Sequence, residues 1–171
     1  MSESPLARQL ELARFDRAVE VAESLAESRA LLTTAELARM NCILIGKDKD
    51  QNWDPWRKEP ITLKLPSGRS LAVSVLADPK LNAREKLHRA TEYAESGAII
   101  EAAVHVYVGF VLLHAFEDAN RRTGVVACHY FLKRYGVPLS GMALHELGLG
   151  DLREEGQLEQ LRNTIHQMAA F

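Results

Sequence analysis

The sequence predicts an all-α domain that carries a single β-hairpin. Most of the chain repeats apolar residues every three or four positions, which is the spacing of an amphipathic helix. Residues 61–75 differ, because apolar and polar residues alternate there on both sides of a Pro-Ser-Gly turn. The chain has 171 residues and a hydrophobic fraction of 47%, so we expect residues 1–171 to form one domain around one core.

Two helices are predicted before the hairpin. The first covers residues 6–29 of the N-terminal segment 1–30, because a single apolar stripe recurs there at helical spacing. The second begins near Thr33, where the sequence Thr-Thr-Ala-Glu has the pattern of a capping box, and ends at Gly46. A polar loop then leads to the hairpin, which cannot be stable alone and must lean on the helices.

Four helices are predicted after the hairpin, and the middle pair forms the centre of the domain. Asp78 and Pro79 end the second strand, and a helix follows over residues 82–95. The central helices occupy residues 98–135, with a polar loop between an almost wholly apolar first helix and a second helix that stops at Gly136. A last amphipathic helix carries the apolar stripe Leu158, Leu161, Ile165 and Met168.

The charge and hydropathy patterns exclude two classes of partner. The formal net charge is -2, so the chain as a whole lacks the excess of positive charge that is typical of nucleic-acid binders. The apolar run at residues 98–116 is short for a membrane span and contains Glu101, His105 and His114, which are costly in lipid. The N-terminus lacks the pattern of a secretion signal, and both cysteines lie alone among apolar neighbours, so we expect a cytoplasmic protein.

The loop between the central helices has the composition of an anion site. A helix that begins near residue 121 presents unpaired backbone N–H groups and the positive end of its dipole. Ala119 and Asn120 allow the chain to curl into a nest for phosphate oxygens. Arg121 and Arg122 add two guanidinium groups, whose forked donors suit phosphate.

The same loop carries groups suited to proton transfer and metal binding. His114 is a candidate general base, because the ordinary pKa of histidine lies near neutral pH. Asp118 offers a hard oxygen ligand for Mg²⁺, and Phe116 is expected to pin the loop to the core. A purely structural interpretation also fits the spacing, because Asp118 or Asn120 is a natural N-cap for the following helix.

A zinc site is a weaker interpretation of three other residues. His105 lies one helix away from the adjacent pair Cys128 and His129. Adjacent residues on a helix point to different faces, and no standard ligand spacing is present. We therefore expect a buried thiol and buried histidines rather than a metal centre.

The loop resembles the signature of the Fic/Doc family, written H-P-F-x-[D/E]-G-N-[G/K]-R. Residues 114–122 read His-Ala-Phe-Glu-Asp-Ala-Asn-Arg-Arg. The family fold is a small helical core in which this motif joins two central helices, and an upstream β-hairpin called the flap guides the target. The hairpin at residues 61–75, and Trp56-Arg57 just before it, resemble that arrangement. The resemblance runs from about residue 31 to the C-terminus.

The resemblance implies roles for five residues of the loop. His114 would deprotonate a hydroxyl on a target protein, and Asp118 would hold Mg²⁺ on the phosphates of ATP or another NTP. Asn120 and the loop amides would form the anion nest, Arg122 would contact a phosphate, and Phe116 would be structural. The target would add a strand to the flap, with contacts from Ile61, Leu63 and Leu65.

Departures from the family pattern leave the chemistry open. Ala119 replaces glycine, Arg121 stands where AMP-transferring members have glycine and Doc has lysine, and Val125 replaces their second arginine. These changes favour phosphoryl transfer of the Doc type, whereas the flap and the length of the chain favour AMP transfer (AMPylation). A degenerate protein that binds a nucleotide or a partner without turnover is a third possibility. A separate antitoxin protein is a possible partner if the chain is a toxin.

Overall fold

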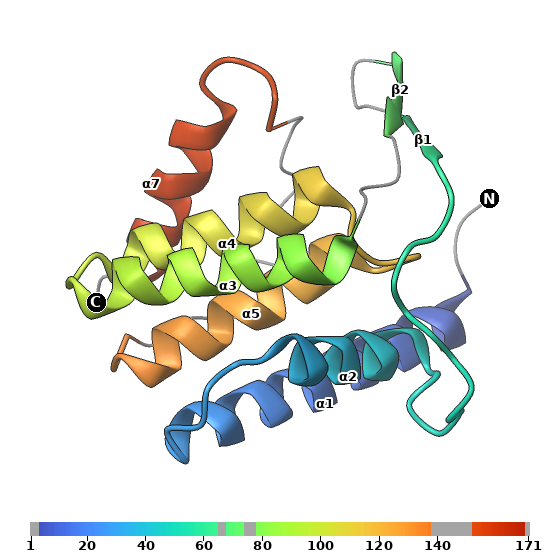
Figure 1. Ribbon diagram of the computed structural model, residues 1–171, viewed down its shortest axis with the longest axis horizontal. Helices are drawn as coiled ribbons and strands as arrows, with labels where there is room; N and C mark the ends of the chain where they lie inside the picture. Colours follow the sequence, from blue (N-terminus) through green and yellow to red (C-terminus); the bar gives the residue numbers. More distant parts are fainter. Residues whose placement is uncertain (1–3, 65–67, 74–77, 138–151, 170–171) are drawn as a thin grey trace.

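The computed structural model confirms an all-α fold with one β-hairpin (Figure 1). It describes residues 4–64, 68–73, 78–137 and 152–169. Within these ranges six helices and one two-stranded antiparallel sheet form. The elements are α1 (Pro5–Glu27), α2 (Thr34–Ile45), β1 (Ile61–Lys64), β2 (Ser70–Val73), α3 (Pro79–Glu95), α4 (Ile99–Leu113), α5 (Asn120–Arg134) and α7 (Gln157–Ala169).

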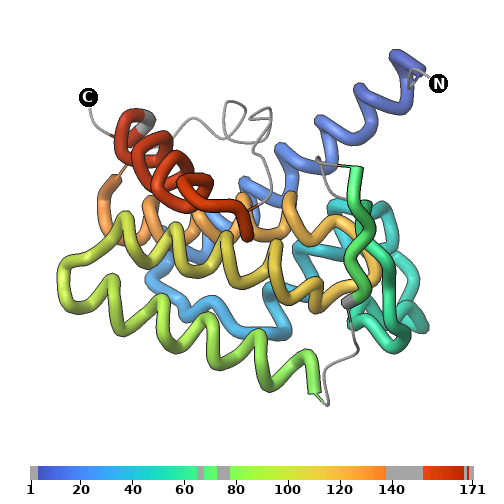
Figure 2. The backbone as a smooth tube through the Cα atoms, turned by 90° about the horizontal axis from the view of Figure 1, so that it is seen from above, coloured from blue at the N-terminus to red at the C-terminus, as the bar shows by residue number. Residues whose placement is uncertain are grey.

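Helices α4 and α5 form the centre of the molecule. They pack against each other, α3 and α7 lie against α4, and α1 and α2 lie against α5 (Figures 1 and 2). Helix α5 is buried along most of its length, from Thr123 to Leu132, which explains why its sequence lacks a polar face. In the part of the chain that the structure describes, no helix has both the length and the apolar character needed to cross a bilayer.

Capping residues set the helix boundaries. The Thr33 hydroxyl accepts a hydrogen bond from the Glu36 amide at 3.2 Å, as the capping pattern predicts, although the Glu36 carboxylate pairs with Arg39. Gly46 ends α2 in the left-handed conformation with φ 73°, which favours glycine. Helix α3 begins at Pro79, three residues earlier than predicted, because the Asp78 side chain caps it by accepting from the Leu81 amide at 3.1 Å.

The hairpin stands at the end of the helical bundle where α4 turns into α5 (Figure 1). Its register pairs Ile61 with Val73 and Leu63 with Leu71. Ile61 and Leu63 are half-buried while their neighbours on β1 are exposed, so one face of the strand is turned toward the bundle. The turn residues 66 and 67 and the predicted contact residue Leu65 lie outside the described residues.

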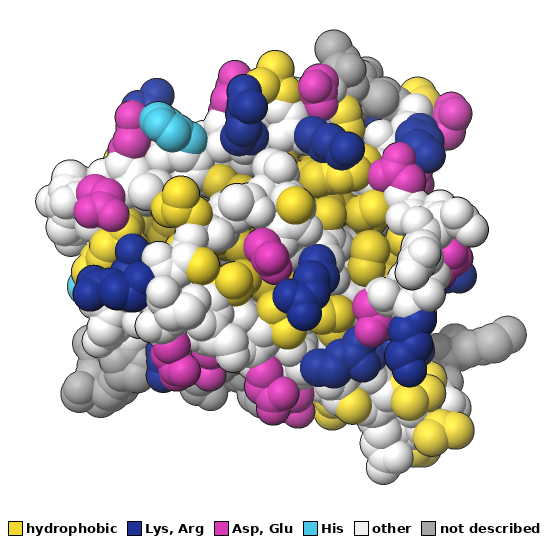
Figure 3. Space-filling model, turned by 60° about the horizontal axis from the view of Figure 1, so that its bottom comes forward, with side chains coloured by type: hydrophobic (Ala, Val, Ile, Leu, Met, Phe, Trp, Pro, Cys, Tyr) yellow, Lys and Arg dark blue, Asp and Glu magenta, His cyan; other side chains and the backbone are white. Residues whose placement is uncertain are grey.

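Charges of both signs are mixed on the surface. Figure 3 shows lysine, arginine, aspartate and glutamate side chains distributed over one face, with apolar patches between them. This mixture agrees with the small formal net charge of -2. The chemistry of the molecule must therefore be sought in a local arrangement of groups rather than in a global field.

Candidate active site at the joint of the two central helices

A cavity of about 400 Å³ opens between the motif loop and the hairpin. It brings together side chains from the end of α4, the loop, the start of α5 and β1. The lining residues are Ile61, Leu63, His114, Glu117, Asp118, Ala119, Asn120, Arg121 and Arg122. The sequence therefore predicted most of the lining, and the structure adds Glu117. Phe116 is fully buried behind the loop.

His114 ends α4 in the left-handed conformation, with φ 47°. Its Nδ1 lies 2.7 Å from the Val111 carbonyl oxygen. Because a carbonyl oxygen only accepts, Nδ1 must carry the proton, and Nε2 of the neutral ring is left as the acceptor. Burial lowers the pKa of His114 below its ordinary value, and the nearby cations Arg57 and Arg153 lower it further, against the bond to Val111. The ring is therefore neutral near pH 7, as a general base requires.

The motif loop is joined to the segment that precedes the hairpin. Trp56 and Phe116 form an antiparallel bridge, and their rings stack with centroids 4.6 Å apart. The Arg57 amide donates to the Ala115 carbonyl at 2.9 Å, and the Glu117 amide donates to the Pro55 carbonyl at 2.9 Å. These bonds fix the loop relative to the root of the hairpin.

Asn120 holds the loop closed from within. Its Oδ1 accepts from the Phe116 amide at 2.9 Å, and its Nδ2 donates to the Phe116 carbonyl at 3.0 Å. The side chain is only 4% exposed and both ends of its amide are engaged. The resemblance implies that Asn120 and the loop amides form the anion nest, and in this structure the Asn120 side chain holds the shape of that loop.

The start of α5 has the features of an anion site. Ala119 is its N-cap, has φ 58°, and makes no side-chain capping bond. The structural interpretation, in which Asp118 or Asn120 caps the helix, does not hold, because Asp118 Oδ1 accepts instead from the adjacent Ala119 amide at 2.6 Å. A helix end without a side-chain cap keeps its N–H groups and positive dipole for a ligand.

The two arginines of the motif have different surroundings. Arg121 is exposed at the cavity. Arg122 is half-buried, and its Nη1 lies 3.3 Å from Glu11 Oε1 of α1. The N-terminal half of α1 reaches the same end of the molecule as the hairpin (Figure 2). A carboxylate outside the motif therefore already engages the guanidinium that was predicted to bind phosphate.

Two residues near the loop received no role from the sequence. Asn41 of α2 is fully buried, and its Nδ2 donates to the Asp118 carbonyl at 2.8 Å and to the Thr123 hydroxyl at 3.0 Å. Arg57 is 3% exposed and donates to the backbone at the end of α4. For Asn41 the available signal was an amide on an otherwise apolar helix face, since buried polar groups almost always have a partner.

The residues present fit Mg²⁺ if the ligand supplies phosphate oxygens. Among the described residues, no group of three His, Cys, Asp or Glu side chains could hold a metal ion. Mg²⁺ is commonly held by one or two carboxylates together with substrate phosphates and water. Asp118 is exposed at the cavity beside the anion-binding end of α5 and can supply such a carboxylate.

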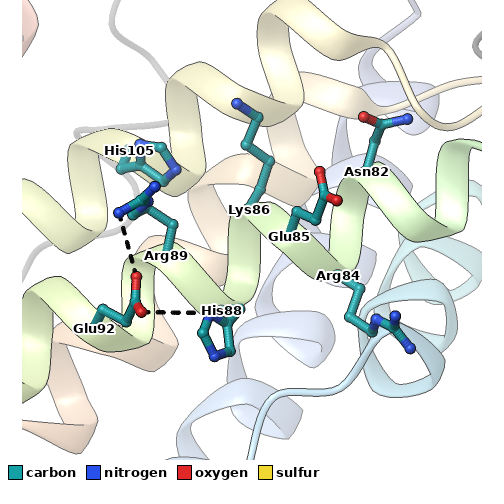
Figure 4. A pocket seen from close by; sticks show the side chains of 8 residues that line it. All are labelled: Asn82, Arg84, Glu85, Lys86, His88, Arg89, Glu92 and His105. Atoms are coloured by element: carbon teal, nitrogen blue, oxygen red, sulfur yellow. Dashed lines mark ion pairs between the residues drawn. The ribbon is translucent and has the colours of Figure 1, made fainter.

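A second and larger cavity, of about 700 Å³, lies between α3 and α4 (Figure 4). Arg89 reaches toward His105 there, and burial, together with the cations Lys86 and Arg89, lowers the pKa of His105. Glu92 pairs with both Arg89 and His88 at this surface. Seven of its eight lining residues come from α3 and the eighth is His105 of α4, so the motif loop contributes nothing to this cavity.

Cys128 and His129 make contacts in different directions. The Cys128 thiol donates to the Ala103 carbonyl at 3.1 Å, whereas His129 Nδ1 lies 3.9 Å from Glu23 Oε1. Burial raises the pKa of the thiol and lowers the pKa of the imidazole to about 4. Both residues therefore belong to the packing of α5.

Comparison with known proteins gives one family and several similar structures. The sequence model of the Fic/DOC family matches residues 31–132. A Fic domain-containing signaling protein from Bacteroides thetaiotaomicron superposes with a TM-score of 0.72 at 15% identity, over 99% of this chain and 71% of that one. Fic-1 from C. elegans superposes with a TM-score of 0.60 at 17% identity, over 98% of this chain.

The chain spans about half the length of the C. elegans Fic-1 fragment in that structure, 49% of it. A variant of the same Fic-1 fragment gives a TM-score of 0.53 at 20% identity, with 98% and 52% of the two chains covered. At these identities the structures support the fold alone. No protein of curated function matches the sequence.

Proposed function

Because this chain belongs to the Fic/DOC family, whose members are generally nucleotide-transferring modifiers of proteins, we propose that it moves a phosphate-containing group from an NTP to a protein hydroxyl. One observation carries the proposal: a neutral imidazole, an exposed carboxylate and an uncapped helix start line a single cavity beside the hairpin. A base, a metal ligand and an anion site are what such a transfer requires.

His114 is assigned as the general base. Its Nδ1 proton is held by the Val111 carbonyl, so Nε2 can accept the proton of an incoming hydroxyl. The hydroxyl oxygen then attacks phosphorus, and the bond from that phosphorus to the bridging oxygen of the leaving group breaks. Ile61 and Leu63 flank the cavity, which supports docking of the target segment along β1.

The start of α5 is assigned to the phosphates. Its backbone N–H groups and dipole would bind phosphate oxygens, and Arg121 and Arg122 would neutralise their charge. Asp118 would hold Mg²⁺, which when bound supplies further neutralisation of the phosphate charge. These groups act where negative charge develops, which is the main source of catalysis in phosphoryl transfer.

Between the two chemistries, we favour phosphoryl transfer. Val125 is fully buried in the core, so its position offers no cation to a terminal phosphate. Arg121 lies at the cavity, where the glycine of AMP-transferring members would leave more space in the anion site. In phosphoryl transfer the hydroxyl oxygen attacks the γ phosphorus and ADP leaves. In the alternative, AMP transfer, it attacks the α phosphorus and pyrophosphate leaves.

A third candidate is a protein that binds a nucleotide or a partner without turnover. The contact between Arg122 and Glu11 favours it, because a carboxylate that neutralises the arginine weakens its attraction for phosphate. If the chain is a toxin, a separate antitoxin protein would be a natural partner of this kind.

The test uses ATP labelled separately at the α and γ phosphates, incubated with a cell lysate, Mg²⁺ and either wild type or His114→Ala. We expect γ label on protein, and a loss of about 10²- to 10⁴-fold in the rate with His114→Ala, the usual contribution of a general base. His88→Ala is the matched control, because His88 is an exposed histidine on α3 outside this cavity.

Each outcome selects one candidate. Protein labelled only from α-labelled ATP would establish AMP transfer instead of phosphoryl transfer. No label from either nucleotide, with ATP binding still measurable by calorimetry, would establish the binding protein. Equal labelling by wild type and His114→Ala would refute the assignment of His114.

A further inference from the structure

Arg57 makes several contacts at one end of the candidate active site. Its Nε donates to the His114 carbonyl at 2.6 Å, and its Nη1 donates to the Glu59 carbonyl at 3.0 Å. Its Nη2 lies 3.4 Å from the Leu113 carbonyl, and its own amide donates to the Ala115 carbonyl. One residue therefore binds the backbone on both sides of His114 and also the chain that enters the hairpin.

The position of this guanidinium has a physical reason. The last carbonyls of a helix have no intrahelical partner, and a cation at that end also interacts favourably with the helix dipole. His114 adopts φ 47°, a conformation that is unfavourable for a residue with a Cβ atom and persists only where the surroundings hold it. Arg57 supplies such support directly, because it binds the carbonyl of the left-handed residue itself.

We propose that Arg57 is the positioning residue of His114, and that it links the position of the imidazole to the root of the hairpin. The inference rests on the proposed role of His114 as the base. Glu59 lies two residues before β1, so the same guanidinium contacts the end of α4 and the start of the surface assigned to the target. Docking of a target strand would then hold the base in place.

Lysine cannot replace arginine in this role. The guanidinium is a rigid planar fork whose N–H groups point in fixed directions, whereas the lysine ammonium is a single charge on a flexible stem. Arg57→Lys therefore keeps the positive charge near His114 but cannot span the carbonyls of residues 59, 113 and 114. Arg57→Gln removes the charge as well.

The first measurement is independent of activity. The imidazole signals of wild type, Arg57→Lys and Arg57→Gln are followed by NMR between pH 4 and 9 without nucleotide or Mg²⁺, with His114→Ala identifying the signal of His114. Arg57→Gln is expected to raise the pKa of His114, because a nearby cation that lowers it is removed. Arg57→Lys is expected to shift the His114 signal at every pH, because the ring moves.

The second measurement is transfer of label in the assay described above. For Arg57→Lys we expect kcat to fall about 10²-fold, the usual effect of a misplaced catalytic group, with KM for the nucleotide changed less than about 3-fold. Arg39→Lys is the matched control, because Arg39 is an exposed arginine that pairs with Glu36 on α2. Its NMR spectrum, kcat and melting temperature should match those of the wild type.

The outcomes separate this inference from the proposed function. If wild type transfers no label but the substitutions still shift the His114 signal and pKa as expected, the positioning role stands and the function is wrong. If wild type transfers label and Arg57→Lys equals it in kcat and in the His114 signal, the positioning role is refuted. Loss of cooperative unfolding in both Arg57 variants would also refute it, since Arg57 would then support only the fold.

Discussion

Among single residues, the polar side chains around the motif loop fall into two groups. Asn41, Arg57 and Asn120 are buried and bind the loop backbone, which leaves them little capacity for a ligand. His114 and Asp118 also line the cavity but are more exposed. The first group fixes where the second group lies, because buried hydrogen bonds to backbone restrict the loop to one shape.

The first prediction concerns the pH dependence of transfer. The pKa of His114 lies below its ordinary value of 6.5, chiefly through burial. A general base must be unprotonated, so kcat/KM should rise as pH increases through that lowered pKa and be level at neutral pH. A pH–rate profile between pH 4.5 and 8 measures this midpoint. A midpoint above 6.5 would contradict the assignment.

The second prediction concerns the ion pair between Arg122 and Glu11. Both side chains are partly shielded, with 20% and 29% exposure. Removing the carboxylate with Glu11→Gln should leave Arg122 more attractive to phosphate, and the Kd for ATP with Mg²⁺ should fall about 3- to 5-fold, the equivalent of about 1 kcal/mol. Calorimetry measures the change. Glu20→Gln, on the exposed side of α1, is the control, and equal affinities in all three proteins would exclude any role for the pair.

The sequence identified the polar residues of the motif loop but not the residues that they contact. The loop residues were identified because their chemistry stands out inside an apolar region. The Glu11 contact could not be foreseen, because it joins α1 to α5 across most of the chain and its only sequence signal is one acid among many on a helix. The side-chain bonds of Asn120 could not be foreseen either, since nothing in the sequence reveals that Phe116 occupies both ends of its amide.

At the level of secondary structure, local signals located most elements. The apolar periods identified the helices, and α4 and the hairpin began where the sequence suggested. The largest displacement was at α3, where Asp78 and Pro79 were interpreted as a break although aspartate followed by proline also starts a helix. Such a pair is compatible with both interpretations, and only the path of the chain decides between them.

The third prediction concerns the start of α5. Ala119 has φ 58°, which costs about 1–2 kcal/mol for an L-residue and nothing for glycine. Glycine also lowers the free energy of unfolding by about 0.5–1 kcal/mol, because it has more conformational freedom in the unfolded chain. The two effects oppose each other, so Ala119→Gly should leave the free energy of unfolding within about 1 kcal/mol of wild type. Urea denaturation measures this value.

The matched control is the same substitution inside the same helix. Ala127 is fully buried in α5 with ordinary helical geometry. Ala127→Gly should lower the free energy of unfolding by about 2 kcal/mol, from lost helix propensity and lost methyl burial. Equal losses at positions 119 and 127 would mean that Ala119 is not held in the left-handed conformation in solution.

For the whole molecule, the core and the site depend on each other. Helix α5 begins at the cavity and is the most buried of the helices that the structure describes, so groups that stabilise its packing also hold the anion site in place. His129 is one of the titratable side chains in that packing. It is 5% exposed, its Nε2 has no hydrogen-bond partner among the described residues, and its ring meets Phe15 of α1 edge-on.

The fourth prediction is a loss of global stability in mild acid caused by His129. Burial lowers its pKa from 6.5 to about 4 in the folded protein. The Glu23 carboxylate at 3.9 Å would favour the protonated ring, but it lies beyond hydrogen-bond distance, so we expect burial to dominate. As pH falls below 6.5, His129 is protonated in the unfolded chain but not in the folded chain. The free energy of unfolding therefore decreases until the pH reaches about 4.

The size of this effect follows from the difference between the two pKa values. Stability should fall by up to about 1.4 kcal/mol per pH unit, or about 3 kcal/mol across the window. Urea denaturation of wild type and His129→Gln at pH 7.5, 6 and 4.5 separates this loss from that of other groups, because His129→Gln should decline less steeply. His88→Gln, which alters an exposed histidine, should keep the wild-type slope. The same slope in His129→Gln would show that His129 is already protonated in the folded core or open to solvent.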